Sequence, residues 1–267
     1  MKTAFSFLTI LLTPLRFIAC ATVPNTKRQQ LKLVSSGQMM SSSYQEYDKF
    51  LKENKLSTDK KSSDTVKRTG LRVQKAVEAY FAQNNMSDRL KGYEWEFNLV
   101  ENEQVNAWCM PGGKVVVYTG ILPFTKDEAG LATVMAHEIA HAVAEHGNER
   151  MSQRLLQAAG AVALDVALRE KPQETRNTWL LAYGVGTEFG AILPYSRIHE
   201  TEADQLGLIF MAMAGYNPEA AVDFWTRMSE QKGKKSPPEI LSTHPSSQTR
   251  INNLKSFLPE AMRYYKK

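Results

Sequence analysis

The chain has 267 residues, of which 43% are hydrophobic and 23% charged, with 15 glycines and 11 prolines. This is the composition of an ordinary globular protein, and it excludes collagen-like, low-complexity and wholly disordered chains. The formal net charge of +5 is small, and the lysines and arginines are scattered, so we expect no binding to nucleic acid. Beyond the N-terminus, no apolar run reaches the roughly 20 residues that a membrane span needs, which excludes a polytopic membrane protein.

The N-terminus has the pattern of an export signal. Lys2 precedes the apolar run Ala4–Leu12, and small residues stand near Cys20. This order resembles the leader of a bacterial lipoprotein, in which Cys20 carries the lipid and becomes the first mature residue. Arg16 interrupts the apolar region, which leaves a plain secretory leader or an uncleaved anchor open. We expect a leader over residues 1–20, lipidation of Cys20, and an exported, periplasmic protein anchored to a membrane.

The rest of the chain divides near residue 65. Residues 21–64 are polar, and their sparse apolar positions predict an N-terminal extension with one helix between flexible arms. From residue 65 the hydrophobic pattern strengthens, which predicts a single domain over 65–267. Its first strands are expected at 93–99, 105–110 and 114–118, as a small antiparallel meander.

After residue 124 the pattern is almost entirely helical. Thr125 and Glu128 have the spacing of a capping box, and Gly147 stands where the first helix would end. That helix is expected over 126–146. Further helices are expected over 150–169, 174–190, 197–214, 218–230 and 246–257. The predicted fold class is therefore α+β, a mostly helical single domain with a small antiparallel sheet beside the 126–146 helix.

The 126–146 helix contains the H-E-x-x-H motif His137-Glu138-Ile139-Ala140-His141. Two histidines four residues apart lie on one face of a helix, so both imidazoles can bind a single zinc ion. Glu138 is rotated by about 100° and can reach a metal-activated water as a general base. The helix is apolar on nearly all sides, which indicates burial, and two buried histidines without a partner would be costly. The motif predicts one Zn²⁺ ion per chain.

His146 is a tempting third ligand, but its position on the helix is unfavourable. It follows His137 by nine residues, about 180° around the helix, whereas the metzincin pattern places its third histidine ten residues after the first. We expect His146 to be a helix-end residue that interacts with the C-terminal dipole.

A better third ligand lies in the 197–214 helix. Glu200 can complete a His₂Glu site and leave the fourth position to water, as catalytic zinc requires. Asp204 shares its face and can accept the free ring N–H of a ligand histidine. Spacing alone leaves Glu202 and His199 as rivals of Glu200.

Four motifs occur in order along the chain: the strand segment Asn106–Gly113, the H-E-x-x-H helix, Glu200-x-x-x-Asp204 and Thr243-His244-Pro245. Together they resemble the zinc peptidases, or gluzincins, of the CAAX prenyl protease and heat-shock protease HtpX family. The resemblance covers about residues 65–257 and is greatest to soluble, single-domain bacterial lipoproteins and to the mitochondrial peptidase with overlapping activity.

The resemblance implies a role for each motif residue. The implied zinc ligands are His137, His141 and Glu200, with Glu138 as catalytic base and Asp204 as support for the ligand histidines. His244 is implied to contact the substrate or the oxyanion, and Arg250 could pair with a carboxylate. The implied substrate-binding edge strand includes Asn106, Ala107, Gly112 and Gly113; such an edge binds an extended peptide through its backbone.

We therefore expect a zinc-dependent endopeptidase that hydrolyses unfolded or damaged envelope proteins through a zinc-activated water. Its expected partners are polypeptide substrates and, through the lipid, the membrane; the oligomeric state is not indicated. The alternative is a zinc-dependent binding protein or chaperone with little turnover, against which Glu138 argues because binding alone needs no such carboxylate. A latent protease, covered by residues 35–64 or by a loop, also stays open.

Overall fold

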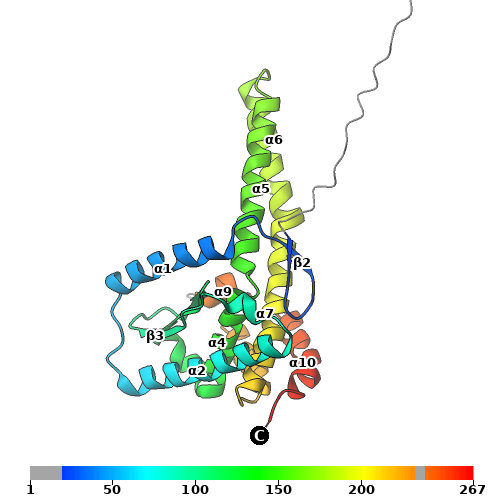
Figure 1. Cartoon of the computed structure of the whole chain (residues 1–267). Coiled ribbons are helices and arrows are strands. Elements are labelled where there is room, and N and C mark those ends of the chain that lie inside the picture. The colour runs from blue at the N-terminus through cyan, green and yellow to red at the C-terminus, as the bar shows by residue number, and fades with distance from the viewer. Residues whose placement is uncertain (1–19, 232–237, 267) are drawn as a thin grey trace, which may run out of the picture.

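The computed structural model describes residues 20–231 and 238–266, and this part of the chain is mostly helical with two small sheets (Figure 1). The predicted α+β class is confirmed. Within the described ranges, no helix combines the length and the apolar character needed to span a membrane. The predicted leader, apart from Cys20, lies outside the described residues.

The strands are β1 (Cys20–Thr22), β2 (Gln29–Leu31), β3 (Glu96–Val100), β4 (Ala107–Met110) and β5 (Lys114–Tyr118). The helices are α1 (Ser36–Glu53), α2 (Lys60–Gln83), η1 (Ser87–Leu90), η2 (Thr119–Ile121), α3 (Leu122–Thr125), α4 (Glu128–Val143), α5 (His146–Ala167), α6 (Gln173–Thr187), η3 (Glu188–Ile192), α7 (Leu193–Met213), α8 (Glu219–Ser229), α9 (Ile240–Thr243) and α10 (Gln248–Met262).

The larger sheet has the strand order β3-β5-β4 and is not the predicted meander. Strand β5 pairs antiparallel with β4, as expected, but parallel with β3. The prediction assumed that consecutive strands are neighbours. In the structure, β3 and β4 form the two opposite edges of the sheet. The turn at Gly112 and Gly113, both with positive φ, then returns the chain so that β5 lies between the other two strands. Strand β5 is buried along its whole length, as its unbroken Val115–Val117 run suggests.

Helix α4 runs through the core, where every residue from Gly130 to Val143 is buried. It packs against α7, α2, α8 and β4 (Figure 1). Its sequence is apolar on all sides except for the motif residues, which explains the complete burial. A Cβ on Gly207 of α7 would lie only 3.3 Å from the Cα of His137. The glycine therefore lets α4 and α7 approach closely, directly beside the H-E-x-x-H motif.

Both predicted ends of this helix are wrong by a few residues. Asp127, rather than Thr125, is the N-cap: its carboxylate accepts a hydrogen bond from Gly130 N at 2.8 Å. Thr125 instead closes the short helix α3. At the other end the chain turns at Glu145, whose φ of 58° is left-handed, and Gly147 lies inside α5. Ion pairs with Lys32 and Arg89 hold the Glu145 side chain at this turn.

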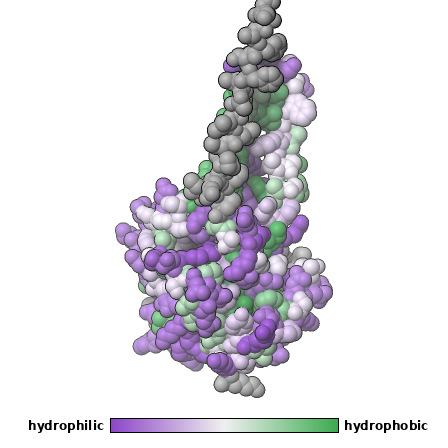
Figure 2. Space-filling view, turned by 45° about the vertical axis from the view of Figure 1, so that its right-hand side comes forward, coloured by the Kyte–Doolittle hydropathy of each residue, from purple (hydrophilic) through white to green (hydrophobic). Residues whose placement is uncertain are grey.

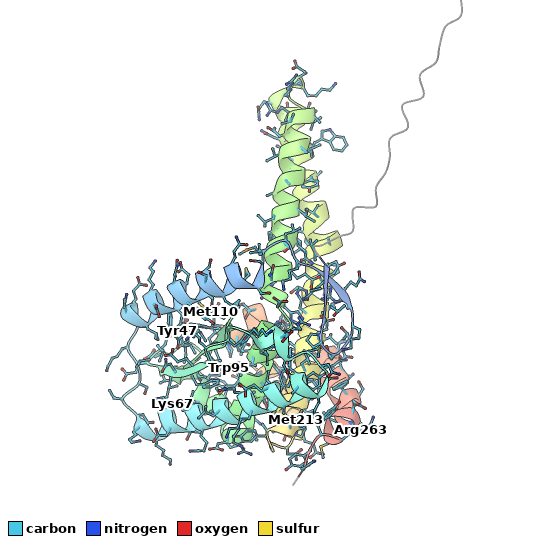
Figure 3. All side chains as sticks on the ribbon, viewed as in Figure 1. Tyr47, Lys67, Trp95, Met110, Met213 and Arg263 are labelled. Carbon is cyan, nitrogen blue, oxygen red and sulfur yellow. The ribbon has the colours of Figure 1, made fainter. Side chains whose placement is uncertain are left out.

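The N-terminal segment folds onto the rest of the molecule. Helix α1 lies across the larger sheet, and Tyr47 points from it into an apolar cluster that includes Met110 of β4 (Figure 3). Strands β1 and β2 form an antiparallel hairpin, which lies beside α7 (Figure 1). Helix α2 begins at Lys60, so it crosses the boundary expected near residue 65.

Helices α5 and α6 form a hairpin that projects away from the body and returns through η3 into α7 (Figure 1). No residue of α6 is buried, and apolar side chains are visible at the surface of the hairpin (Figure 2). Its only buried residues on α5 are at the base, where α5 leaves α4: they are His146, Asn148, Glu149 and Ser152. The hairpin therefore contributes to the interior only beside the H-E-x-x-H motif.

Candidate metal centre

Two helices bring the three predicted metal ligands together. His137 and His141 extend from α4 with their Nε2 atoms 3.1 Å apart. Glu200 reaches them from α7, with one carboxylate oxygen 3.2 Å from His141 Nε2 and the other 3.4 Å from His137 Nε2. The two Nε2 atoms and the Glu200 carboxylate therefore converge on one point.

His244 adds a fourth donor to this set. It follows α9, and its Nδ1 lies 2.9 Å from Glu200 Oε2 and 3.1 Å from His137 Nε2. One donor atom from each of the four residues lies within 4.8 Å of the other three. Two or three imidazole nitrogens with one carboxylate oxygen form a donor set that suits Zn²⁺. The His244 ring therefore stands where the three-ligand prediction leaves room for water.

Burial and neighbouring charges shift the pKa values of the three predicted ligands. Burial would raise the pKa of Glu200, but contacts with His141, His137 and His244 hold it far below its usual range. Burial lowers the pKa of the His141 imidazole well below its ordinary value, so its nitrogen lone pair is free at neutral pH. Burial also acts to lower the pKa of His137, but hydrogen bonds to Asp204 and Glu200 raise it to about 9. A cation bound at His137 must therefore displace a proton.

Glu138 lies between the donor set and a cavity of about 250 Å³. Its Oε1 is buried and makes no hydrogen bond to any described residue, although His244 Nε2 is 3.2 Å away. The cavity is bounded by His141 and His244, by β4 and by α1, through Met39 and Met40. A buried carboxylate oxygen with spare acceptor capacity at a cavity wall can take a proton from a water there.

The predicted substrate strand is only partly at this cavity. Asn106 and Ala107 line it, together with Trp108 of β4. Gly112 and Gly113 lie in the β4–β5 turn instead, where they pack against Tyr44 and Trp95. Among the described residues, β4 has β5 as its one strand neighbour, so its outer backbone edge is not paired in the sheet.

Asp204 lies one turn after Glu200 on α7 and contacts His137. One carboxylate oxygen lies 3.0 Å from His137 Nδ1. Arg250 of α10 binds both oxygens of the same carboxylate, at 2.7 and 2.8 Å, and its guanidinium lies 3.4 Å from the centre of the Trp225 ring. Burial would raise the pKa of Asp204, but Arg250 and His137 lower it below its ordinary value. The carboxylate is therefore ionised and fixed in orientation.

A second polar network lies behind His141, and the sequence interpretation missed it. His146 does not lie at the C-terminal end of the motif helix, where a contact with the helix dipole was expected: it begins α5 and is completely buried, with its Nδ1 3.0 Å from His141 Nδ1 and its Nε2 3.2 Å from Glu202. Glu202 and His199, considered above as rival ligands, face away from the donor set and belong to this network. A signal was present, because His146/Glu149 and His199/Glu202 are both histidine–glutamate pairs three residues apart on a helix.

Arg28 closes this second network from the N-terminal segment. Its guanidinium binds both oxygens of Glu149, at 2.8 and 2.7 Å, and both oxygens of Glu202, each at 3.0 Å. Burial would raise the pKa of both carboxyl groups, but hydrogen bonds with Arg28 and the neighbouring histidines lower each to about 2. Burial lowers the pKa of His146 to about 4 despite the contact with Glu202. At neutral pH, Arg28 thus binds two carboxylates, one of which also contacts the neutral imidazole of His146.

Comparison with known proteins agrees with this geometry. Residues 66–258 match the sequence model of peptidase family M48. The chain is 38% identical over 194 residues to the mitochondrial metalloendopeptidase OMA1 of Schizosaccharomyces pombe, covering 72% of this chain and 54% of that protein. It is 29% identical over 249 residues to human OMA1, covering 90% and 46%, and 32% identical over 162 residues to the beta-barrel assembly-enhancing protease of Escherichia coli, covering 59% and 33%. The chain thus spans about half or less of the length of these relatives.

Proposed function

Because the chain belongs to peptidase family M48, we propose that it is a zinc-dependent endopeptidase that cleaves polypeptides with an activated water molecule. The observation that carries this proposal is the convergence of the donor set beside the unbonded Glu138 Oε1 at the wall of a cavity. The donors fit zinc because they combine imidazole nitrogens with one ionised carboxylate. Family membership agrees with the resemblance described above; the CAAX/HtpX type and the lipoprotein type remain predictions.

The motif residues then have distinct roles. His137, His141 and Glu200 would hold the zinc ion, which when bound polarises the scissile carbonyl and lowers the pKa of a water. Glu138 would accept the proton of the attacking water and deliver it to the leaving amine. Asp204 would keep the His137 ring turned so that Nε2 faces the metal. No covalent bond between enzyme and substrate is needed.

The substrate would bind as an extended strand along the outer edge of β4. Backbone hydrogen bonds at such an edge give affinity with little dependence on sequence. Asn106 and Ala107 line the cavity beside Glu138 and would align the scissile bond. Gly112 and Gly113 would contribute only by shaping the turn that ends this strand. This mode of binding suits unfolded polypeptides, whose backbones are exposed.

We also propose that the substrates are unfolded or damaged envelope proteins, and that Cys20 carries a lipid that anchors the protein at the periplasmic side of a membrane. The leader pattern supports export, and a bacterial relative is named for beta-barrel assembly. Mass spectrometry of the membrane fraction tests the anchor: a diacylglyceryl adduct on Cys20 is expected, and an unmodified Cys20 in a soluble fraction contradicts it.

The catalytic role of Glu138 is tested by hydrolysis and metal content measured in the same preparation. We expect Glu138→Gln to keep its zinc and to hydrolyse casein about 10²–10⁴-fold more slowly, because it loses the general base. A chelator should abolish the wild-type activity. Substantial hydrolysis by Glu138→Gln would contradict the assigned role. A zinc-loaded wild-type protein that binds casein without cleaving it would instead favour the chaperone alternative.

His244→Ala in the same assay decides what the fourth imidazole does. The ring stands against Glu200 and His137, where an incoming carbonyl or water must fit. We therefore expect the alanine variant to hydrolyse casein faster than wild type, as expected of a protease whose resting site is closed by this side chain. A fall in activity with zinc retained would contradict this and assign His244 to substrate or oxyanion contact.

A further inference from the structure

The two ring nitrogens of His141 face different surroundings. Nε2 points into the donor set, 3.2 Å from Glu200 Oε1. Nδ1 points the other way, 3.0 Å from Nδ1 of His146. A metal bound at Nε2 uses the lone pair of that nitrogen, so the hydrogen of the neutral ring is on Nδ1. His141 then donates a hydrogen bond to His146.

This donation determines the hydrogen position on His146 as well. Because its Nδ1 accepts, its single hydrogen is on Nε2, which lies 3.2 Å from Glu202 Oε2. The ring is completely buried, so water cannot replace either contact. Each donor in the series from His141 through His146 to Glu202 thus has an acceptor, and the order of hydrogens is the only one compatible with metal at His141 Nε2.

The N-terminal segment sets the position of Glu202. Between β1 and β2, Arg28 donates from Nε and Nη2 to the two oxygens of Glu202, and Thr26 Oγ1 donates to Oε1 at 2.6 Å. The Glu202 side chain is only 2% exposed. The carboxylate that His146 needs is therefore held by residues 174 and 176 positions earlier in the chain, on the hairpin that lies beside α7 (Figure 1).

We propose that Arg28, Glu202 and His146 are positioning residues that hold His141 in its Nδ1–H form, so that the β1–β2 hairpin is part of the metal centre. Carboxylates that contact a ligand histidine directly orient it and strengthen metal binding; here His146 transmits that effect from one residue further away. The inference rests on the proposed function only in requiring a metal at His141.

Glu149 provides a matched control for Glu202. Both carboxylates bind the same guanidinium, and both side chains are 2% exposed. Glu149, however, hydrogen-bonds to His199, whose ring only stacks on His146 at 4.5 Å. Loss of either negative charge should weaken the Arg28 cluster to a similar degree, but only Glu202 accepts the hydrogen bond of His146.

The test compares the zinc affinity of Glu202→Gln and Glu149→Gln in the full chain, by competition with a chromophoric chelator at one pH. We expect Glu202→Gln to bind zinc about 10-fold more weakly than wild type and Glu149→Gln to stay within about 3-fold. Urea unfolding of the metal-free variants should show similar losses of stability in the two. Equal zinc affinities of Glu202→Gln and wild type, or equal losses in both variants, would overturn the proposal.

A measurement on the wild type covers the case in which Glu202→Gln does not fold. In the zinc-loaded protein, ¹⁵N NMR of the imidazoles should show hydrogen on Nδ1 of His141 and on Nε2 of His146. Hydrogen on Nδ1 of His146 would overturn the assignment. Zinc affinity and the NMR measurement are both independent of hydrolysis. A protein that binds zinc but cleaves nothing refutes the proposed function and leaves this inference standing. A protein that cleaves casein but has hydrogen on Nδ1 of His146 refutes this inference and leaves the proposed function standing.

Discussion

The two metal-facing histidines are supported in different ways. Asp204 contacts His137 directly, and Arg250 binds that carboxylate. Behind His141, the carboxylate is one imidazole further away, and its arginine comes from the N-terminal segment. The first support lies within residues 66–258, which match the family model, whereas the second needs Arg28 from outside them. Residues 66–258 therefore do not contain all the groups that orient the two histidines, because Arg28 lies outside them.

Removal of Arg28 should have the largest effect on stability. Arg28→Met leaves Glu149 and Glu202 buried without their counter-ion, and unpairing a buried charge costs about 3–5 kcal/mol. Urea unfolding of the metal-free protein measures this loss. Arg154→Met is the control, because Arg154 pairs with Glu188 on the exposed hairpin, at 55% and 31% side-chain exposure, and should cost less than about 1 kcal/mol. Similar losses in the two variants would show that the N-terminal segment is not anchored through Arg28.

The zinc affinity of Asp204→Asn compares the direct support of His137 with the indirect support of His141. We expect zinc affinity to fall by about 100-fold, at the upper end of the range for groups that orient a ligand, because Asp204 contacts His137 without an intermediate. Glu202→Gln should lose less. Asp223→Asn, an exposed change on α8, is the control and should bind zinc as the wild type does. A smaller loss for Asp204→Asn than for Glu202→Gln would reverse the proposed ranking.

The smallest effect is a pH dependence of the second support. The pKa of Glu149 is 4.5 in its ordinary state and about 2 in the folded protein, so the folded state binds its proton less readily than the unfolded state. The stability it contributes is complete above pH 4.5 and is lost as the pH falls toward 2. The free energy of unfolding of wild type minus that of Glu149→Gln should be constant above pH 5 and decrease below pH 4.5. A difference that grows on acidification would contradict the assigned ion pair.

The parts of the site that could be predicted depend on local spacing. The four-residue interval in H-E-x-x-H and the same interval between Glu200 and Asp204 each define one helix face, so each pair could be placed on a common face from sequence. Helices α4 to α8 and α10 could be located by their periodicity, with ends displaced by a few residues, whereas the four-residue helix α9 was not predicted.

The parts that could not be predicted depend on contacts between distant segments. No periodicity reveals that β3 and β5 are parallel, because strand order depends on the crossing between them. The left-handed turn at Glu145 is another such feature, since the side chain of this residue is held by Lys32 and Arg89, which are distant in sequence. Arg28 looks like any polar residue of a serine- and lysine-rich segment until folding places it between Glu149 and Glu202.

The projecting α5–α6 hairpin is a suitable site for an inserted label. Its tip, near Arg169 and Glu170, is highly exposed and lies at the end farthest from the body (Figure 1). The distance between α4 and α7 depends on their close packing at Gly207. It does not depend on the length of the hairpin that connects them. An epitope or a fluorescent label inserted at the tip should therefore leave the peptidase chemistry intact, since surface turns of this kind accept added residues readily.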